Sequence, residues 1–103
     1  MKVIALKMIT GEDVVARLES TKFVGEFRET DAYVIDKPFV LHVQHTPQGM
    51  AMGLAPWTLA NPGMSSLTVP ASSVLVMYDV DAGVEQQYLQ QTSGIDLSVP
   101  GRR

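Results

Sequence analysis

Few side chains in this 103-residue sequence have the type and spacing that catalysis or metal binding requires. His42 and His45 stand three apart in a segment of strand character, so they would face opposite sides, and no suitable third ligand is nearby. Asp79 and Asp81 stand directly before a predicted helix, where capping is a sufficient role for a carboxylate. The chain has no cysteine and no recognisable nucleophile, metalloprotease or phosphate-loop motif. The sequence therefore predicts no enzyme, no metal site and no cofactor.

The residues that could contact a nucleic acid gather around Tyr33. This tyrosine opens a predicted strand, where its ring either stacks on a base or packs as a half-buried side chain. Lys22, Arg28 and Lys37 flank it in the sequence and could contact phosphates, although four acidic residues interleave with them. The net charge of −3 provides no attractive field for phosphates, so a site of this kind must be local.

A long uncharged stretch is the most unusual feature of the sequence. The 41 residues from Pro38 to Tyr78 include no Asp, Glu, Lys or Arg. Natural proteins charge the exposed edge strands of a sheet or pair them with a partner, and this chain does not charge them. We expect the apolar residues of two strands to contact a neighbouring subunit head to tail, which can close a ring: Met50, Met52, Leu54, Val74, Val76 and Tyr78. The alternative is that the helix, the loops and Trp57 cover these strands within one subunit.

Alternating apolar residues predict the strands that would position these side chains. Residues 2–10 and 14–19 form a hairpin around a turn that contains Gly11. A third strand over residues 33–43 should bend at Pro38, which lacks an N–H. Residues 50–55 and 73–80 complete a set of five strands, and residues 56–66 are predicted to be an irregular loop.

A short helix is predicted at about residues 82–92. Asp81 can cap its first turn, Val84 and Tyr88 share one face, and Gly94 stands past its end. Residues 1–94 then form one domain, the usual arrangement for a chain of this length. Residues 95–103 form a flexible tail in which Arg102 and Arg103 either aid solubility or contact nucleic acid weakly.

The composition is that of a folded globular protein, with 46% hydrophobic and 18% charged residues. No window approaches the roughly 18 apolar residues of a membrane helix, and the N-terminal residues lack the pattern of a secretory signal. The absence of cysteine fits a reducing compartment. We therefore expect a soluble cytoplasmic protein that has no membrane partner.

Several short segments match the motifs of a known group of β proteins. Val3–Lys7, followed by Gly11 and then Val14–Leu18, is similar to the first two strands of the Sm1 motif. Asp31–Val34 is similar to the start of the third Sm strand, and Leu67–Val74 occupies the place of the Sm2 motif. The chain thus resembles the Sm/LSm-like family of small β-barrels.

Three segments are similar, more specifically, to uncharacterised Sm-like proteins of marine, cyanophage-type bacteriophages: Leu6–Ala16, Ala55–Trp57 and Val69–Pro70. The resemblance implies a five-stranded, bent antiparallel SH3-like barrel with a short C-terminal helix, assembled into a homo-oligomeric ring of roughly five to seven subunits. It also implies a non-catalytic module of nucleic-acid processing that binds RNA or single-stranded DNA, in the host cytoplasm if a phage encodes it.

The alternative function is that of a phage structural or host-interaction adaptor that binds only protein. Sm proteins that hold RNA follow the aromatic residue of their third strand with Met-Asn and place Arg-Gly in Sm2. Here Tyr33 precedes Val34-Ile35 and Val69 precedes Pro70-Ala71, so the base-reading asparagine and the stacking arginine are absent. Together with the acidic net charge, these departures favour the protein-only role.

Overall fold

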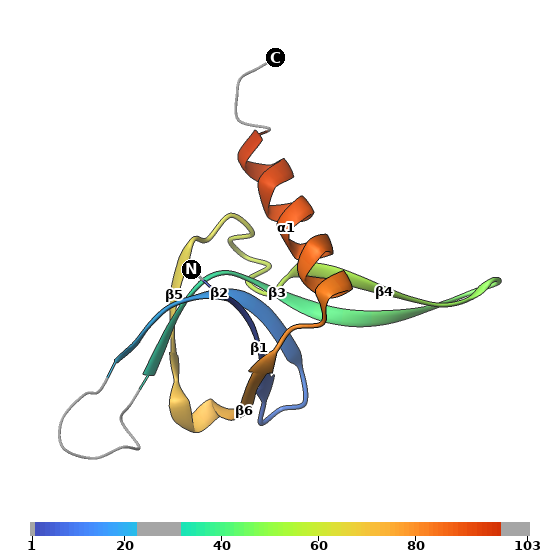
Figure 1. Ribbon diagram of the computed structural model, residues 1–103. Coiled ribbons are helices and arrows are strands. Elements are labelled where there is room, and N and C mark those ends of the chain that lie inside the picture. The colour runs from blue at the N-terminus through green and yellow to red at the C-terminus, as the bar shows by residue number, and fades with distance from the viewer. Residues whose placement is uncertain (1, 23–31, 98–103) are drawn as a thin grey trace.

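The computed structural model describes residues 2–22 and 32–97, which form a curved antiparallel sheet followed by a helix (Figure 1). The strands of this described part are β1 (Lys2–Met8), β2 (Asp13–Lys22), β3 (Ala32–Thr46), β4 (Gly49–Pro56), β5 (Ser66–Pro70) and β6 (Val74–Asp79). The 3-10 turn η2 (Ala71–Ser73) leads from β5 into β6, and the helix α1 (Ala82–Leu97) comes last. The predicted mostly β class is confirmed.

Strands β1 and β2 form the predicted hairpin. Their register places Leu6 opposite Val14, so the alternating apolar residues of the two strands face the same side. The turn is closed by two hydrogen bonds, from the Met8 N–H to the Glu12 carbonyl and from the Gly11 N–H to the Met8 carbonyl, both 2.9 Å long. Gly11 has a φ of 104°, a conformation that strongly favours glycine.

Strand β3 is the centre of the sheet, and it bends at Lys37 and Pro38 as predicted. Along one edge it pairs with β2, while along the other it pairs first with β5 and then with β4. At the bend Lys37 has a φ of 50°, the Lys37 N–H donates to the Ser65 carbonyl over 3.1 Å, and the Pro38 carbonyl accepts from the Trp57 N–H over 3.0 Å. The bend therefore gives one edge of β3 two successive partners.

The described part of the chain has six strands where the sequence predicted five. The order is β4-β3-β2-β1-β6, with β5 on β3 beside this path. The additional strand, β5, has only five residues and ends at Pro70. The alternation of Leu67 and Val69 is too short to distinguish this strand from the loop before it. No pairing joins β5 to β6 within the described residues, so the curved sheet does not close. The prediction of a closed five-stranded barrel is therefore wrong in this respect.

Buried side chains cover the two faces of the sheet at β1 and β2. One face carries the inner cluster, which is Ile4, Leu6, Met8, Val14, Ala16, Ile35 and Val69. The opposite face, under α1, carries the helix-side cluster, which is Val3, Val15, Phe39, Leu54 and Tyr88. Because neighbouring residues of a strand point to opposite faces, the stretches 3–6 of β1 and 14–16 of β2, which are buried on both faces, are apolar throughout.

Helix α1 begins as predicted and continues further than predicted. The Asp81 carboxylate accepts from the Gly83 N–H over 3.0 Å, which caps the first turn. Val84 packs on the helix-side cluster, and Tyr88 is fully buried within it. The helix passes Gly94 and ends at Leu97, because a glycine weakens a helix by about 1 kcal/mol without terminating it. Neither α1 nor any other helix within the described ranges has the length and hydropathy of a membrane span.

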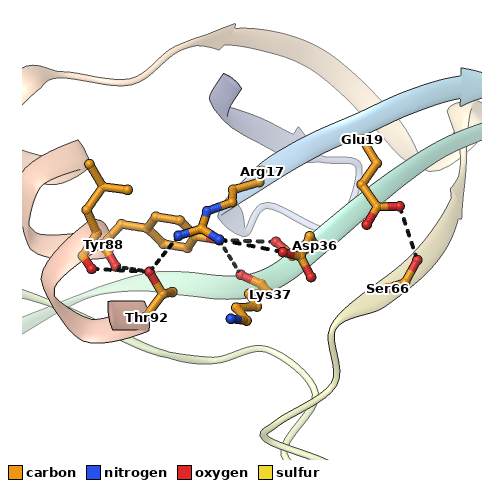
Figure 2. Close-up of polar contacts among 8 residues, drawn as sticks. Arg17, Glu19, Asp36, Lys37, Ser66, Tyr88 and Thr92 are labelled. Carbon is orange, nitrogen blue, oxygen red and sulfur yellow. Dashed lines mark hydrogen bonds and ion pairs between the residues drawn. The ribbon is translucent and has the colours of Figure 1, made fainter. Parts of the chain in front are cut away.

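Tyr88 joins α1 to the bend of β3. Its hydroxyl donates to the carbonyls of Asp36, over 3.1 Å, and of Lys37, over 2.8 Å. Its ring packs edge-on against Phe39, with the ring centroids 5.7 Å apart. Arg17 lies beside this contact, with Nη1 3.8 Å from the Asp36 carboxylate and Nη2 donating to the Thr92 hydroxyl over 3.3 Å (Figure 2).

Replacing Tyr88 with Phe should lower the free energy of unfolding by about 1–3 kcal/mol, because two carbonyls at the bend lose a buried donor while the ring packing is kept. Urea denaturation followed by circular dichroism measures this change. Leu89→Ala, on an exposed position of the same helix, is the matched control and should change stability by no more than about 0.5 kcal/mol. Equal stability of Tyr88→Phe and the wild type would contradict this role of the hydroxyl.

Candidate functional site

Strands β4 and β6 are the outer strands of the sheet order. In the part of the chain that the structure describes, β4 pairs only with β3, and β6 pairs only with β1. Each therefore presents a free edge of backbone N–H and carbonyl groups. The side chains along these edges are apolar and exposed: Met50 is 71% exposed, Met52 54%, Val76 50% and Tyr78 42%.

The six predicted interface residues fall into two groups. Met50, Met52, Val76 and Tyr78 are the exposed members described above. Leu54 is buried in the helix-side cluster, and Val74 is half-buried against the inner cluster, so these two residues pack within the subunit. Packing against Tyr88 of α1 explains Leu54, because the helix covers a residue that alternation places on the same face as Met50 and Met52.

Two other exposed apolar residues lie on or next to these edge strands. Val43 lies opposite Met52 in the register of β3 and β4, and it is 52% exposed. Leu75 lies beside Val76 on β6 and is 66% exposed. Both residues belong to the long uncharged stretch of the sequence. The stretch alone does not indicate which of its residues face solvent.

The β3–β4 hairpin extends away from the rest of the sheet (Figure 1). Thr46 pairs with Gly49 across its tip, where Gly49 has a φ of 127°. Within the hairpin the His42 ring lies over Gly53, and a Cβ added to this glycine would lie 2.8 Å from the His42 ring. His45 is exposed beside Met50. Among the described residues, no three His, Cys, Asp or Glu groups are placed to hold a metal ion.

A polar contact fixes Tyr78 at the β6 edge. The Tyr78 hydroxyl donates to one oxygen of Asp13 over 2.7 Å, and the Lys7 ammonium donates to the other over 3.0 Å. Partial burial acts to raise the pKa of Asp13, but these two hydrogen bonds outweigh it and the net pKa is lowered. Burial, and then the Asp13 carboxylate, raise the pKa of Tyr78 to about 12. The phenol therefore stays neutral and hydrogen-bonded throughout the ordinary pH range.

The residues predicted to contact nucleic acid are only partly brought together. Tyr33 is half-buried and packs against the inner cluster, as in the ordinary packing role of such a residue. It lies opposite Thr21 at the end of the β2–β3 pair, so the backbone of Lys22 is nearby. Lys37 lies at the bend, where its carbonyl binds Tyr88. The Lys22 side chain and Arg28 lie outside the residues whose placement is described.

Three basic side chains of the described sheet lie against carboxylates. Lys2 is 3.0 Å from Asp79, Lys7 is 3.0 Å from Asp13, and Arg17 is 3.8 Å from Asp36. The first pair is exposed and the third is largely buried. These pairings neutralise the positive charges locally, which reduces the attraction that this part of the molecule exerts on phosphate.

An apolar cavity of about 340 Å³ lies between the β1–β2 turn, Trp57 and β5. Its walls include Met8, Ile9, Trp57, Val69 and Pro70. Trp57 is half-buried and also packs against the inner cluster, in keeping with the core-covering role weighed for it from the sequence. The cavity itself was not predicted, since β5, which forms one of its walls, was not recognised as a strand.

Two comparisons with known proteins find no match for this chain. No protein-family model matches the chain, and no curated protein matches it.

Acidic pH should weaken the Asp13 contact. The pKa of Asp13 is lowered on folding, so its contribution to stability is complete above the ordinary value of 3.8 and is lost as the pH falls through the lower folded value. We therefore expect the stability of Asp13→Asn to fall less steeply than that of the wild type below about pH 4. Urea midpoints at several pH values measure the difference, and parallel pH profiles would contradict it.

Proposed function

We propose that this protein is a non-catalytic module that assembles into a homo-oligomeric ring of the Sm-like kind through its β4 and β6 edges. The observation that carries the proposal is the pair of free edges at the two ends of the sheet order, on strands whose one formal charge is Asp79. Because the two edges differ, one copy offers β4 where the next offers β6, so the contact is head to tail. Such a contact forms a ring when the rotation between copies closes.

The exposed side chains support pairing between copies more than they support an isolated subunit. Met50, Met52, Val76 and Leu75 are each at least half exposed, on two strands whose one formal charge is Asp79, at the end of β6. Helix α1 covers Leu54, near the other end of β4, and leaves the Met residues of the hairpin uncovered. A second copy would bury these side chains and satisfy the free backbone groups in one step.

Charge introduced at either edge should prevent assembly. Met52→Lys and Val76→Lys each place an ammonium group in a dry contact, at a cost on the order of 2–3 kcal/mol, or roughly 30- to 150-fold in the association constant. Light scattering should then give a mass near that of one 11.2 kDa chain for each variant. Leu59→Lys, on an exposed loop position away from both edges, is the matched control and should keep the mass of the wild type.

Mixing the two edge variants tests the head-to-tail geometry itself. Met52→Lys keeps an intact β6 edge and Val76→Lys keeps an intact β4 edge, so an equimolar mixture should form dimers that cannot grow. Higher oligomers in the mixture, or a wild type that stays a monomer at high concentration, would contradict the proposal.

The ligand of such a ring is, by the Sm-like resemblance, RNA or single-stranded DNA. One observation favours this function: the partly exposed Tyr33 lies at the end of the β2–β3 pair where Lys22 follows Thr21. A ring repeats this pair once per copy, and several weak contacts along one strand add up to useful affinity. The ion pairs of Lys2, Lys7 and Arg17 favour instead the protein-only adaptor.

Binding of a fluorescent single-stranded oligonucleotide separates these two functions. A ring that contacts phosphates should bind at low salt and weaken as salt rises, and Lys22→Glu should reduce this salt dependence. Tyr33→Leu keeps an apolar side chain on the inner cluster but removes the ring, so it should cost about 1–3 kcal/mol for each stacked base. No binding at low salt would reject the nucleic-acid function and leave the adaptor.

A further inference from the structure

The cavity beside Trp57 has the properties of a binding site that the β4 and β6 edges do not use. Its volume of about 340 Å³ and its apolar walls are typical of sites that take a few side chains of a ligand. None of the residues that line it carries a formal charge. Ile9, on its rim, is 59% exposed, so the cavity is accessible from solvent.

The open side of β5 forms a backbone wall next to this cavity. β5 pairs with β3 along one edge, and among the described strands nothing pairs with its other edge. Thr68, Val69 and Pro70 of β5 all line the cavity. An extended ligand could therefore use the free backbone groups of β5 while its side chains enter the apolar space.

The Glu12 carboxylate lies next to a residue of the rim, and no ion pair joins it to a cation within the described ranges. The Thr10 hydroxyl, which lines the cavity, donates to the Glu12 carboxylate. That hydrogen bond is the main reason why the pKa of Glu12 is below its usual value. A hydrogen bond from the backbone lowers the pKa further, and one from Trp57 has a smaller effect, so the carboxylate is ionised at neutral pH. The nearby Lys7 is engaged by Asp13. The site thus favours a ligand with apolar residues next to a cation.

The sequence of this chain contains a segment of this composition. Residues 98–103 are Ser-Val-Pro-Gly-Arg-Arg, in which an apolar pair precedes two adjacent cations. The other five prolines of the chain belong to the described fold. Aromatic-lined grooves bind proline-containing segments well, because proline loses little conformational entropy on binding.

We propose that residues 98–103 of one copy dock in the cavity of a neighbouring copy, with Pro100 against Trp57 and an arginine at Glu12. The donor is a neighbour because α1, about 24 Å long, leads away from η2 and the β1–β2 turn (Figure 1), whereas six extended residues span at most about 20 Å. The inference rests on the proposed function in one respect: the second copy is supplied by the ring. The docked segment then adds a contact that is separate from the strand edges.

A labelled peptide tests the site without requiring assembly. The probe is a fluorescein-labelled peptide with the sequence of residues 98–103, and the receptor is the full chain carrying Met52→Lys, Arg102→Glu and Arg103→Glu, which removes the competing segment. We expect saturable fluorescence anisotropy and a matching change in the emission of Trp57, the only tryptophan. A peptide with both arginines replaced by glutamate should bind roughly tenfold more weakly.

Two matched substitutions in the receptor locate the site. Ile9→Lys places a cation on the exposed rim and should weaken peptide binding roughly tenfold, whereas Leu89→Lys, exposed on α1, should leave it unchanged. Absence of saturable binding, or equal affinities for Ile9→Lys and Leu89→Lys, would overturn the inference. Because the receptor carries a charged β4 edge, this result does not depend on whether the edges assemble.

Discussion

The hydrogen bonds from the Tyr88 hydroxyl to the carbonyls of Asp36 and Lys37 hold the helix on the sheet where β3 bends. A positive φ at Lys37 and the missing N–H of Pro38 interrupt regular pairing there, and buried backbone groups need partners that a strand would otherwise supply. Tyr88 supplies one, and the backbones of Ser65 and Trp57 supply the others. The β3–β4 hairpin, β5 and α1 all take their positions from this bend.

The bend also explains why the molecule has free edges. A strand that continued straight would pair with one neighbour on each side, whereas β3 passes from β5 to β4 and sends the hairpin out of the curved sheet. β4 is then an outer strand at one end of the order, and β6 is the outer strand at the other. The exposed Met52 and Val76 follow from this topology together with the lack of charge between Pro38 and Tyr78.

Much of the architecture could be predicted from local patterns, because these patterns have local causes. Alternation and a glycine at a positive φ determine the β1–β2 hairpin, Pro38 marks the bend, and Asp81 caps α1. The sequence did not reveal β5, since its pairing with β3 joins residues 30 to 38 positions apart and five residues carry too little periodicity. The closed barrel expected from the Sm-like resemblance fails at the same place, between β5 and β6.

The candidate site was predicted less well, because exposure depends on tertiary packing. Leu54 and Val74 share the alternation of Met52 and Val76, yet α1 and the inner cluster cover them. For Tyr33 the sequence left base stacking and half-buried packing open, and in the structure the residue packs against the inner cluster. The cavity beside Trp57 is formed by segments that are distant in sequence, so no single sequence motif predicts it.

Strand β1 pairs with β2 on one side and with β6 on the other, so residues such as Ala5 contact both Val15 and Tyr78. During synthesis on the ribosome, the β1–β2 hairpin is complete long before β6 leaves the exit tunnel, and the second edge of β1 stays unpaired until then. Neighbouring ribosomes on one messenger RNA hold several nascent chains close together, and each of these chains has the same unpaired edge of β1. The order of synthesis therefore makes β6 the strand that completes the pairing of β1 last.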